Sequence, residues 1–176
     1  MKLYEFAPTR SIRARWILQE LGVDFEAVSV NLAAGEHRRP EFLELNPAGK
    51  VPLLVDGDLV LSESVAIVLY LGEKFPDSGL VPADLRLRAD CYRWMLFAVA
   101  ELEQPLWRIA RHTSLYQEQD RLPADLVLAR RDFKPMAAVL EAHMTGRAYV
   151  ERMYARPRAP RRIGDIFRAM RSGASA

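Results

Sequence analysis

The sequence predicts a protein of the α/β plus all-α class. Two blocks in residues 1–75 indicate the α/β part: a strand–helix–strand unit, and a β-hairpin that leads into a helix. Beyond Asp84, apolar residues recur at helical spacing, which indicates helices alone. We therefore expect one domain at 1–75, a linker at 76–83 that contains two prolines and a glycine, and a helical bundle at 84–176.

The first block contains two strand segments, Lys2–Phe6 and Phe25–Val30, with a helix at Ser11–Leu21 between them. The helix carries apolar residues along one side: Ile12, Trp16, Ile17 and Leu21. A crossover of this length joins parallel strands in a right-handed sense. The block therefore predicts a parallel βαβ unit.

The second block is a hairpin followed by a helix. Apolar segments at 53–55 and 59–61 flank Asp56-Gly57, a dipeptide that favours tight hairpin turns. The polar residues 62–64 then supply capping side chains for the next helix. Unpaired N–H groups and the positive dipole end of such a helix can hold a carboxylate. The complete order, βαβ then ββα, is thioredoxin-like, with a mixed four-stranded sheet and a site for a peptide-like anion.

Five short motifs follow one another between residues 8 and 67: Pro8-Thr9-Arg10-Ser11, Gly35-Glu36-His37, Pro40-Glu41-Phe42, Asn46-Pro47-Ala48-Gly49-Lys50-Val51-Pro52 and Glu63-Ser64-Val65-Ala66-Ile67. Each occurs widely by itself. In this order and spacing, they resemble the cytosolic glutathione transferase family, in a bacterial form of the serine or threonine type. The resemblance implies glutathione as co-substrate and no metal.

The resemblance also implies contacts for two parts of glutathione. Val51 and Pro52 match a motif with a cis proline, before which the backbone pairs with the cysteinyl backbone of glutathione as an added strand would. Glu63 and Ser64 match the pair that captures the γ-glutamyl end, with Ser64 on its carboxylate and Glu63 on its ammonium. A plain helix cap is the alternative role for this pair.

At the other end of glutathione, Lys50 and His37 match positions that reach the glycine carboxylate. An ordinary solvated side chain is the alternative for both.

Catalysis in this family means lowering the pKa of the glutathione thiol. The free value is about 8.5, and a drop of about 2 units requires roughly 2.7 kcal/mol. A hydroxyl that donates to the charged sulfur supplies about 1.5–3 kcal/mol, and a helix N-terminus adds about 0.3–1 kcal/mol. Ser11 and then Thr9 are the candidate donors, and Arg10 adds positive field; Ser11 could instead be a simple N-cap. Tyr4 is a third candidate, for which core packing is the stronger expectation.

Composition limits the classes of function. A formal net charge of +2 over 176 residues gives no global field for nucleic acid. The single cysteine, Cys91, lies in a helical stretch and excludes an intramolecular disulfide, so we expect a buried, inert thiol. No apolar run suits a signal segment or a membrane span. The sequence thus predicts a cytoplasmic protein without membrane or nucleic-acid partners.

In the second part of the chain we expect one helix from Asp84 to about Pro105, and another that starts near Pro123 and is kinked or interrupted at Pro135. The resemblance implies that this part binds the electrophile and contributes to a homodimer. Candidate wall residues are Trp94, Met95, Phe97 and Trp107, although core packing is the alternative for each.

The expected function is transfer of the glutathione thiolate to small, mostly apolar electrophiles. Two alternatives stay open: a non-catalytic interaction protein with this fold, and a glutathione-dependent isomerase or dehalogenase.

After Gly146 the sequence departs from the family pattern, because the segment at 148–157 resembles a helix that normally comes several helices later. Either the chain lacks those helices, or the protein contains a further segment at this point.

Intact mass spectrometry separates these explanations. If a further segment exists, the measured mass will exceed the mass computed from the 176 residues. A matching mass would instead establish a protein truncated in its second domain.

Overall fold

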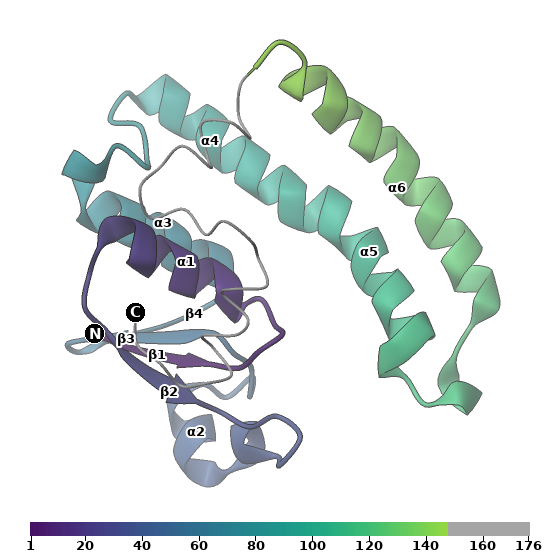
Figure 1. Cartoon of the computed structure of the whole chain (residues 1–176), viewed down its shortest axis with the longest axis horizontal. Coiled ribbons are helices and arrows are strands. Elements are labelled where there is room, and N and C mark those ends of the chain that lie inside the picture. The colour runs from purple at the N-terminus through teal and green to yellow at the C-terminus, as the bar shows by residue number, and fades with distance from the viewer. Residues whose placement is uncertain (148–176) are drawn as a thin grey trace. The chain divides into compact units, whose positions relative to one another are not determined.

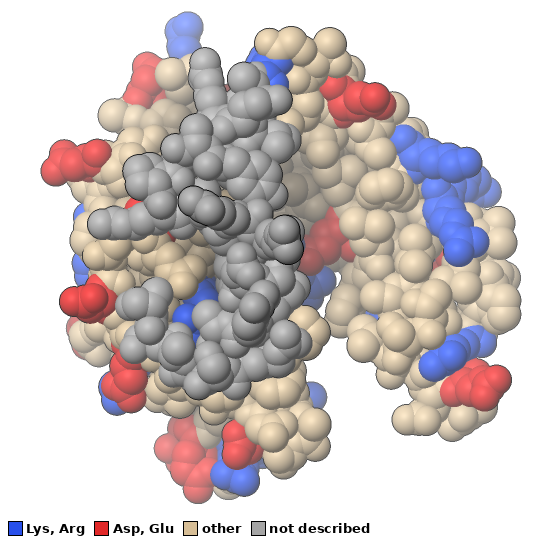
Figure 2. Space-filling view, in the orientation of Figure 1, with Lys and Arg blue, Asp and Glu red and all other residues tan. Residues whose placement is uncertain are grey.

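The computed structural model describes residues 1–147 (Figure 1). These residues form two compact units, Met1–Val81 and a second that begins at Pro82. The tail helix expected beyond Gly146 lies outside the described residues. Basic and acidic side chains both occur on the visible described surface, as the small net charge leads one to expect (Figure 2).

The first unit is built on a four-stranded sheet. Its strands are β1 (Lys2–Glu5), β2 (Glu26–Ser29), β3 (Leu53–Asp56) and β4 (Leu59–Ser62), and they lie in the order β2-β1-β3-β4. β1 pairs in parallel with β2 and antiparallel with β3, and β3 pairs antiparallel with β4. The predicted thioredoxin-like arrangement is therefore confirmed.

Helices cover both faces of this sheet. α1 (Ser11–Leu21) and α3 (Ser64–Lys74) lie on one face and α2 (Pro40–Leu45) on the other (Figure 1). Two short 3-10 turns, Glu36–Arg38 and Pro76–Ser78, complete the unit. Under α1 and α3 the core consists of Leu3, Ala14, Ile17, Leu18, Phe25, Leu54, Ile67 and Leu71. A smaller cluster of Val30, Phe42 and Leu53 lies beneath α2.

One ion pair is completely buried between β1 and α1. The Arg15 Nε donates to both carboxylate oxygens of Glu5 at 3.0 Å, and Arg15 Nη2 also contacts that carboxylate. The two side chains are 0% and 2% exposed. The Arg15 guanidinium also lies 5.5 Å from the centre of the Phe25 ring. This pair fixes α1 against the strand that precedes the loop at 6–10, and the sequence analysis did not anticipate it.

All the secondary structure that is described in the second unit is helical. It contains α4 (Leu85–Phe97), a wide π-type turn (Ala98–Leu102), α5 (Glu103–Ala110), a second wide turn (Arg111–Leu115), a 3-10 turn (Glu118–Asp120) and α6 (Pro123–Met144). Asp84 caps α4, because its Oδ1 accepts from the backbone N–H groups of Arg86 and Leu87 at 3.0 and 2.9 Å.

The predicted end of the first long helix near Pro105 is wrong. Helical backbone continues through Pro105 as far as Leu115. A proline lacks an N–H and its ring crowds the carbonyl one turn earlier. The wide turn at Ala98–Leu102 lies in that preceding turn, where a π-bulge changes the hydrogen-bond spacing. The missing hydrogen bond at Pro105 is thereby accommodated, and the helix continues.

α6 begins at Pro123 as predicted, but it is not interrupted at Pro135. It packs against α5 through charge pairs. The Arg108 Nε lies 3.1 Å from Asp125 Oδ2, and Arg108 Nη1 lies 2.7 Å from Asp132 Oδ2. His112 Nε2 lies 3.2 Å from the same Asp125 carboxylate. Among the described residues, no helix is long and apolar enough to cross a membrane.

Removal of one member of the buried ion pair tests its role in the first unit. Arg15→Met leaves the Glu5 carboxylate buried without its countercharge, and we expect it to lower the free energy of unfolding by about 3–5 kcal/mol. The measurement is denaturant unfolding followed by circular dichroism.

Lys2→Met is the matched control, since Lys2 lies on β1, as Glu5 does, and the pair that it forms with Glu26 of β2 is exposed. Equal small losses for the two variants would contradict a structural role for the Arg15–Glu5 pair.

Candidate functional site

A small polar cavity of about 80 Å³ lies in the first unit. Three segments form it: the loop before α1, the turn that precedes β3, and the junction of β4 with α3. Its lining residues are Arg10, Asn46, Ala48, Lys50, Val51, Pro52, Ser62, Glu63 and Ser64. Five of the predicted site residues for glutathione therefore lie around one cavity, together with Arg10.

Asn46 holds the turn at 46–52 in shape. Its amide nitrogen donates to the Lys50 carbonyl at 2.8 Å, and its amide oxygen accepts from the Ala48 N–H at 3.2 Å. The Gly49 N–H donates to the Asn46 carbonyl at 2.8 Å. Asn46 itself is only 5% exposed, and its side-chain hydrogen bonds are partly buried. Asn46 belongs to the motif at 46–52, but that motif predicted no role for its side chain.

The Val51–Pro52 peptide bond is cis, as predicted. Ala7–Pro8 is also cis, which was not predicted. Pairing between β1 and β3 starts at Leu53 opposite Tyr4, so Val51 lies just beyond the ladder. The Val51 backbone therefore lies at the cavity wall, two residues before β3 begins.

Glu63 and Ser64 form the junction between β4 and α3. Glu63 has a φ of 69°, the only positive value among the described residues that are not glycine. The expectation that side chains at 62–64 cap α3 is wrong, because the N-cap residue is Glu63 and no side chain bonds there. Ser64 is instead the first helical residue and is 4% exposed. This geometry brings the Glu63 and Ser64 side chains to the same cavity.

Arg13 is a site residue that the sequence analysis missed. Its Nη1 donates to Ser64 Oγ at 3.1 Å, from α1 to the first turn of α3. Its only sequence signal is its place in the first turn of α1, directly after the motif that contains Thr9 and Ser11. The guanidinium places positive charge next to the Ser64 hydroxyl.

Thr9 and Ser11 lie beside the cavity but do not line it. Thr9 Oγ1 lies 2.5 Å from the Phe6 carbonyl oxygen and 2.8 Å from Ser11 Oγ. Ser11 Oγ accepts from the Phe6 N–H at 3.4 Å, and Thr9 Oγ1 accepts from the Ser11 N–H at 3.2 Å. Ser11 is completely buried at the first position of α1, whose N-cap residue is Arg10. Of these three turn residues, only Arg10 reaches the cavity.

His37 also lies outside the cavity lining. It belongs to the 3-10 turn Glu36–Arg38 and is half-buried. Its Nδ1 is buried with no hydrogen-bond partner among the described residues. The turn containing His37 approaches the turn at Gly49 closely, as a Cβ built on Gly49 would lie 2.9 Å from the His37 carbonyl oxygen. Contact between His37 and a ligand stays a prediction.

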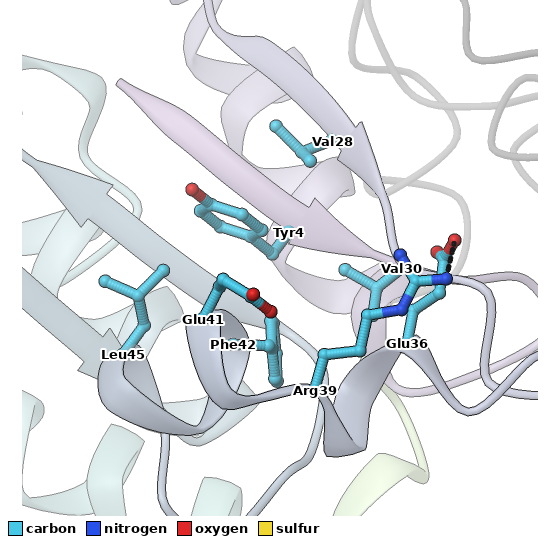
Figure 3. Close-up of a pocket in the computed structure, with 8 residues that line it drawn as sticks. All are labelled: Tyr4, Val28, Val30, Glu36, Arg39, Glu41, Phe42 and Leu45. Carbon is cyan, nitrogen blue, oxygen red and sulfur yellow. Dashed lines mark ion pairs between the residues drawn. The ribbon is translucent and has the colours of Figure 1, made fainter.

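Tyr4 lies in a different and larger cavity, of about 450 Å³, on the α2 face of the sheet (Figure 3). Val28, Val30, Phe42 and Leu45 give this cavity an apolar lining, and Glu36, Arg39 and Glu41 are its charged members. The Tyr4 ring meets Phe42 edge to face at 6.0 Å. The expectation of core packing for Tyr4 is therefore only partly met, and its hydroxyl is not part of the polar cavity.

Two of the candidate wall residues of the second unit, Trp94 and Phe97, contact each other. Trp94 stacks on His143 with ring centres 3.7 Å apart and meets Phe97 edge to face at 5.3 Å. The Arg111 guanidinium lies 5.4 Å from the centre of the Trp107 ring. Cys91 is partly buried. This burial raises the pKa of its thiol, and the neighbouring Asp90 carboxylate raises it further by a smaller amount. The expected burial of Cys91 is therefore only partly met, whereas the raised pKa agrees with the inert thiol that was expected.

Comparison with known proteins identifies the family. Residues 1–73 match the family model described as the glutathione S-transferase N-terminal domain. Glutathione S-transferase 1 of Dianthus caryophyllus is 40% identical over 151 residues, which cover 84% of this chain and 66% of that protein. Glutathione S-transferase F10 of Arabidopsis thaliana is 34% identical over 147 residues, covering 81% of this chain and 68% of the relative. The chain belongs to the glutathione S-transferase family.

A solved structure agrees with this assignment. The theta-class glutathione S-transferase of Xanthomonas axonopodis pv. citri, with glutathione bound, superposes with a TM-score of 0.73 at 28% identity and covers 82% of this chain and 70% of that chain. The family resemblance inferred from the motifs is therefore confirmed. This chain spans between about half and two thirds of the length of these curated relatives.

Gly49 offers a test of the turn that positions Lys50 and Val51. Gly49→Ala places a Cβ 2.9 Å from the His37 carbonyl oxygen and requires a φ of +59°, so we expect lower stability and weaker glutathione binding. The left-handed backbone alone costs about 1–2 kcal/mol, and the backbone clash adds to it. Thermal unfolding and calorimetric titration measure the two effects.

Gly57→Ala is the control, because Gly57 has a φ of +63° and open space around its Cβ position. If both alanine variants behave alike, the close approach at Gly49 has no special role.

Proposed function

We propose that this chain binds glutathione in the polar cavity and transfers its thiolate to small, mostly apolar electrophiles. One observation carries the proposal. The buried Ser64 hydroxyl, held by Arg13 at the first turn of α3, lines the same small cavity as the Glu63 carboxylate and the Lys50 side chain. Charges of both signs around one cavity suit a peptide with an amino-acid head group and a distant carboxylate.

The γ-glutamyl end would bind at Glu63 and Ser64. A serine hydroxyl has one proton and two lone pairs. Because Arg13 donates to Ser64 Oγ, the hydroxyl proton remains for a ligand carboxylate. The positive dipole end of α3 favours the same carboxylate, and the Glu63 carboxylate attracts the ligand ammonium. Together these groups recognise an α-amino acid.

The rest of the peptide would follow the cavity wall. The Val51 backbone, next to the end of the β1–β3 ladder, would pair with the cysteinyl backbone in the manner of strand addition. Lys50 would attract the glycine carboxylate, and His37 would have to turn toward the ligand to assist it. The glutathione-bound Xanthomonas relative supports this choice of ligand.

The reaction requires a thiolate. The glutathione S–H bond breaks, the proton leaves to solvent, and the sulfur uses its electron pair to form a C–S bond with the electrophile. In an addition, the π bond at that carbon opens and its electron pair takes up a proton from solvent; in a substitution, the leaving group departs with the electron pair of the bond that breaks. The turn that contains Thr9, Arg10 and Ser11 would stabilise the charged sulfur. Trp94, Met95, Phe97 and Trp107 remain candidate contacts for the apolar substrate.

A non-catalytic interaction protein with this fold is the second candidate. The internal hydrogen bonds of Thr9 and Ser11 favour it, because hydroxyls that face away from a bound thiol would not activate it. Turnover of an electrophilic test substrate with glutathione distinguishes the two candidates.

Homodimer formation and a cytoplasmic location also stay proposals. Exposed large apolar side chains in the second unit support association with another copy: Leu85, Leu87, Leu96, Leu106, Leu115, Leu122, Val127, Leu128 and Val139.

Ser64→Ala tests the proposed anchor. It removes one hydrogen bond to a charged carboxylate, so we expect glutathione binding to weaken by about 1–2 kcal/mol while the fold is kept. Calorimetric titration gives the affinity, and circular dichroism reports the fold.

Ser78→Ala, in an exposed 3-10 turn, is the control and should bind as the parent protein does. Equal affinity of Ser64→Ala and the parent would place the γ-glutamyl end elsewhere.

A further inference from the structure

The hydroxyl protons of Thr9 and Ser11 can be assigned from the contacts in their loop. A hydroxyl group carries a single proton. The Phe6 carbonyl oxygen carries none, so the 2.5 Å contact between it and Thr9 Oγ1 uses the Thr9 proton. The 2.8 Å contact between the Thr9 and Ser11 hydroxyl oxygens must then use the Ser11 proton. Both protons are therefore engaged inside the loop.

The remaining contacts strengthen this assignment. The Phe6 and Ser11 N–H groups donate to the Ser11 and Thr9 hydroxyl oxygens, respectively, so the two oxygens act as acceptors. Ser11 is completely buried, and neither side chain lines the cavity. A thiolate needs donors, and these two hydroxyls have no proton left to give in this arrangement.

Arg10 lies between these residues in sequence, and it does line the cavity. It is the N-cap residue of α1, with a φ of −62°, so it also lies at the positive end of that helix dipole. On the basis of the proposed function, we infer that the Arg10 guanidinium, and not a hydroxyl, stabilises the thiolate of bound glutathione.

Other charges around the cavity act in different directions. Lys50 adds positive charge, Glu63 opposes ionisation of the thiol, and Arg13 is directed at Ser64. A guanidinium keeps its charge at every working pH and presents several donors in one plane. Its positive charge therefore lowers the pKa of the glutathione thiol.

Thiolate absorbance of bound glutathione, followed against pH, tests this inference. We expect Arg10→Met to raise the apparent thiol pKa by about one to two units, and Arg10→Lys to recover part of the shift. Ser11→Ala and Thr9→Val should each shift it by less than half as much. Arg39→Met, which removes an exposed guanidinium at the other cavity, is the control and should leave the thiol pKa unchanged.

Binding of S-methylglutathione to the same variants separates thiolate stabilisation from peptide binding. This probe keeps both carboxylates and the ammonium but cannot form a thiolate. We expect Arg10→Met to bind it within about twofold of the parent, which also shows that the variant folds.

Two results would overturn the inference. In one, Arg10→Met leaves the thiol pKa in place and loses S-methylglutathione to the same extent as glutathione, which would make Arg10 a carboxylate anchor. In the other, Ser11→Ala or Thr9→Val produces the larger pKa shift. Failure of the parent protein to bind either peptide would instead reject the proposed function itself.

Discussion

The backbone of Glu63 is the constraint on which the candidate site depends. Its φ of 69° turns the chain from β4 into α3 within one residue, so that Ser64 starts the helix in a buried position. A residue other than glycine pays about 1–3 kcal/mol in such a conformation. Glycine would adopt it freely but would supply no carboxylate. A glutamate at this position supplies the carboxylate that the proposed site for a ligand ammonium requires.

The groups around the cavity come from segments far apart in the sequence, and a rigid support holds them together. The buried Arg15–Glu5 pair fixes α1 on β1, and α1 in turn carries Arg13 to Ser64. Asn46 fixes the turn that presents Lys50 and Val51. Since each of these polar contacts is buried or half-buried, water competes weakly for the groups that form them.

Much of the first unit could be predicted from its pattern. The apolar spacing predicts α1 at its observed bounds, and Asp56-Gly57 predicts the hairpin between β3 and β4. The contacts of Arg13 and Arg15 could not be predicted in this way, because each joins a helix to another element through one side chain, and residue spacing gives no signal for such a pair. Ser64 lies 51 residues from Arg13, for example. The proton assignment of Thr9 and Ser11 likewise depends on loop geometry, whereas the identity of these residues shows only that hydroxyls are present. At Pro105, the π-type turn at Ala98–Leu102 accommodates the hydrogen bond that proline cannot form, whereas the rule that proline ends a helix predicts a helix end there.

Backbone amide chemical shifts, measured by NMR while glutathione is added, test the central claim most directly. Two cavities that the described residues of the first unit form lie on different parts of its surface, one next to Val51 and Ser64 and the other next to Val28 and Leu45. Binding at the polar cavity predicts the largest shift changes at the Val51 and Ser64 amides and small changes at Val28 and Leu45. The largest changes at Val28 and Leu45, or no changes in either group, would contradict the account.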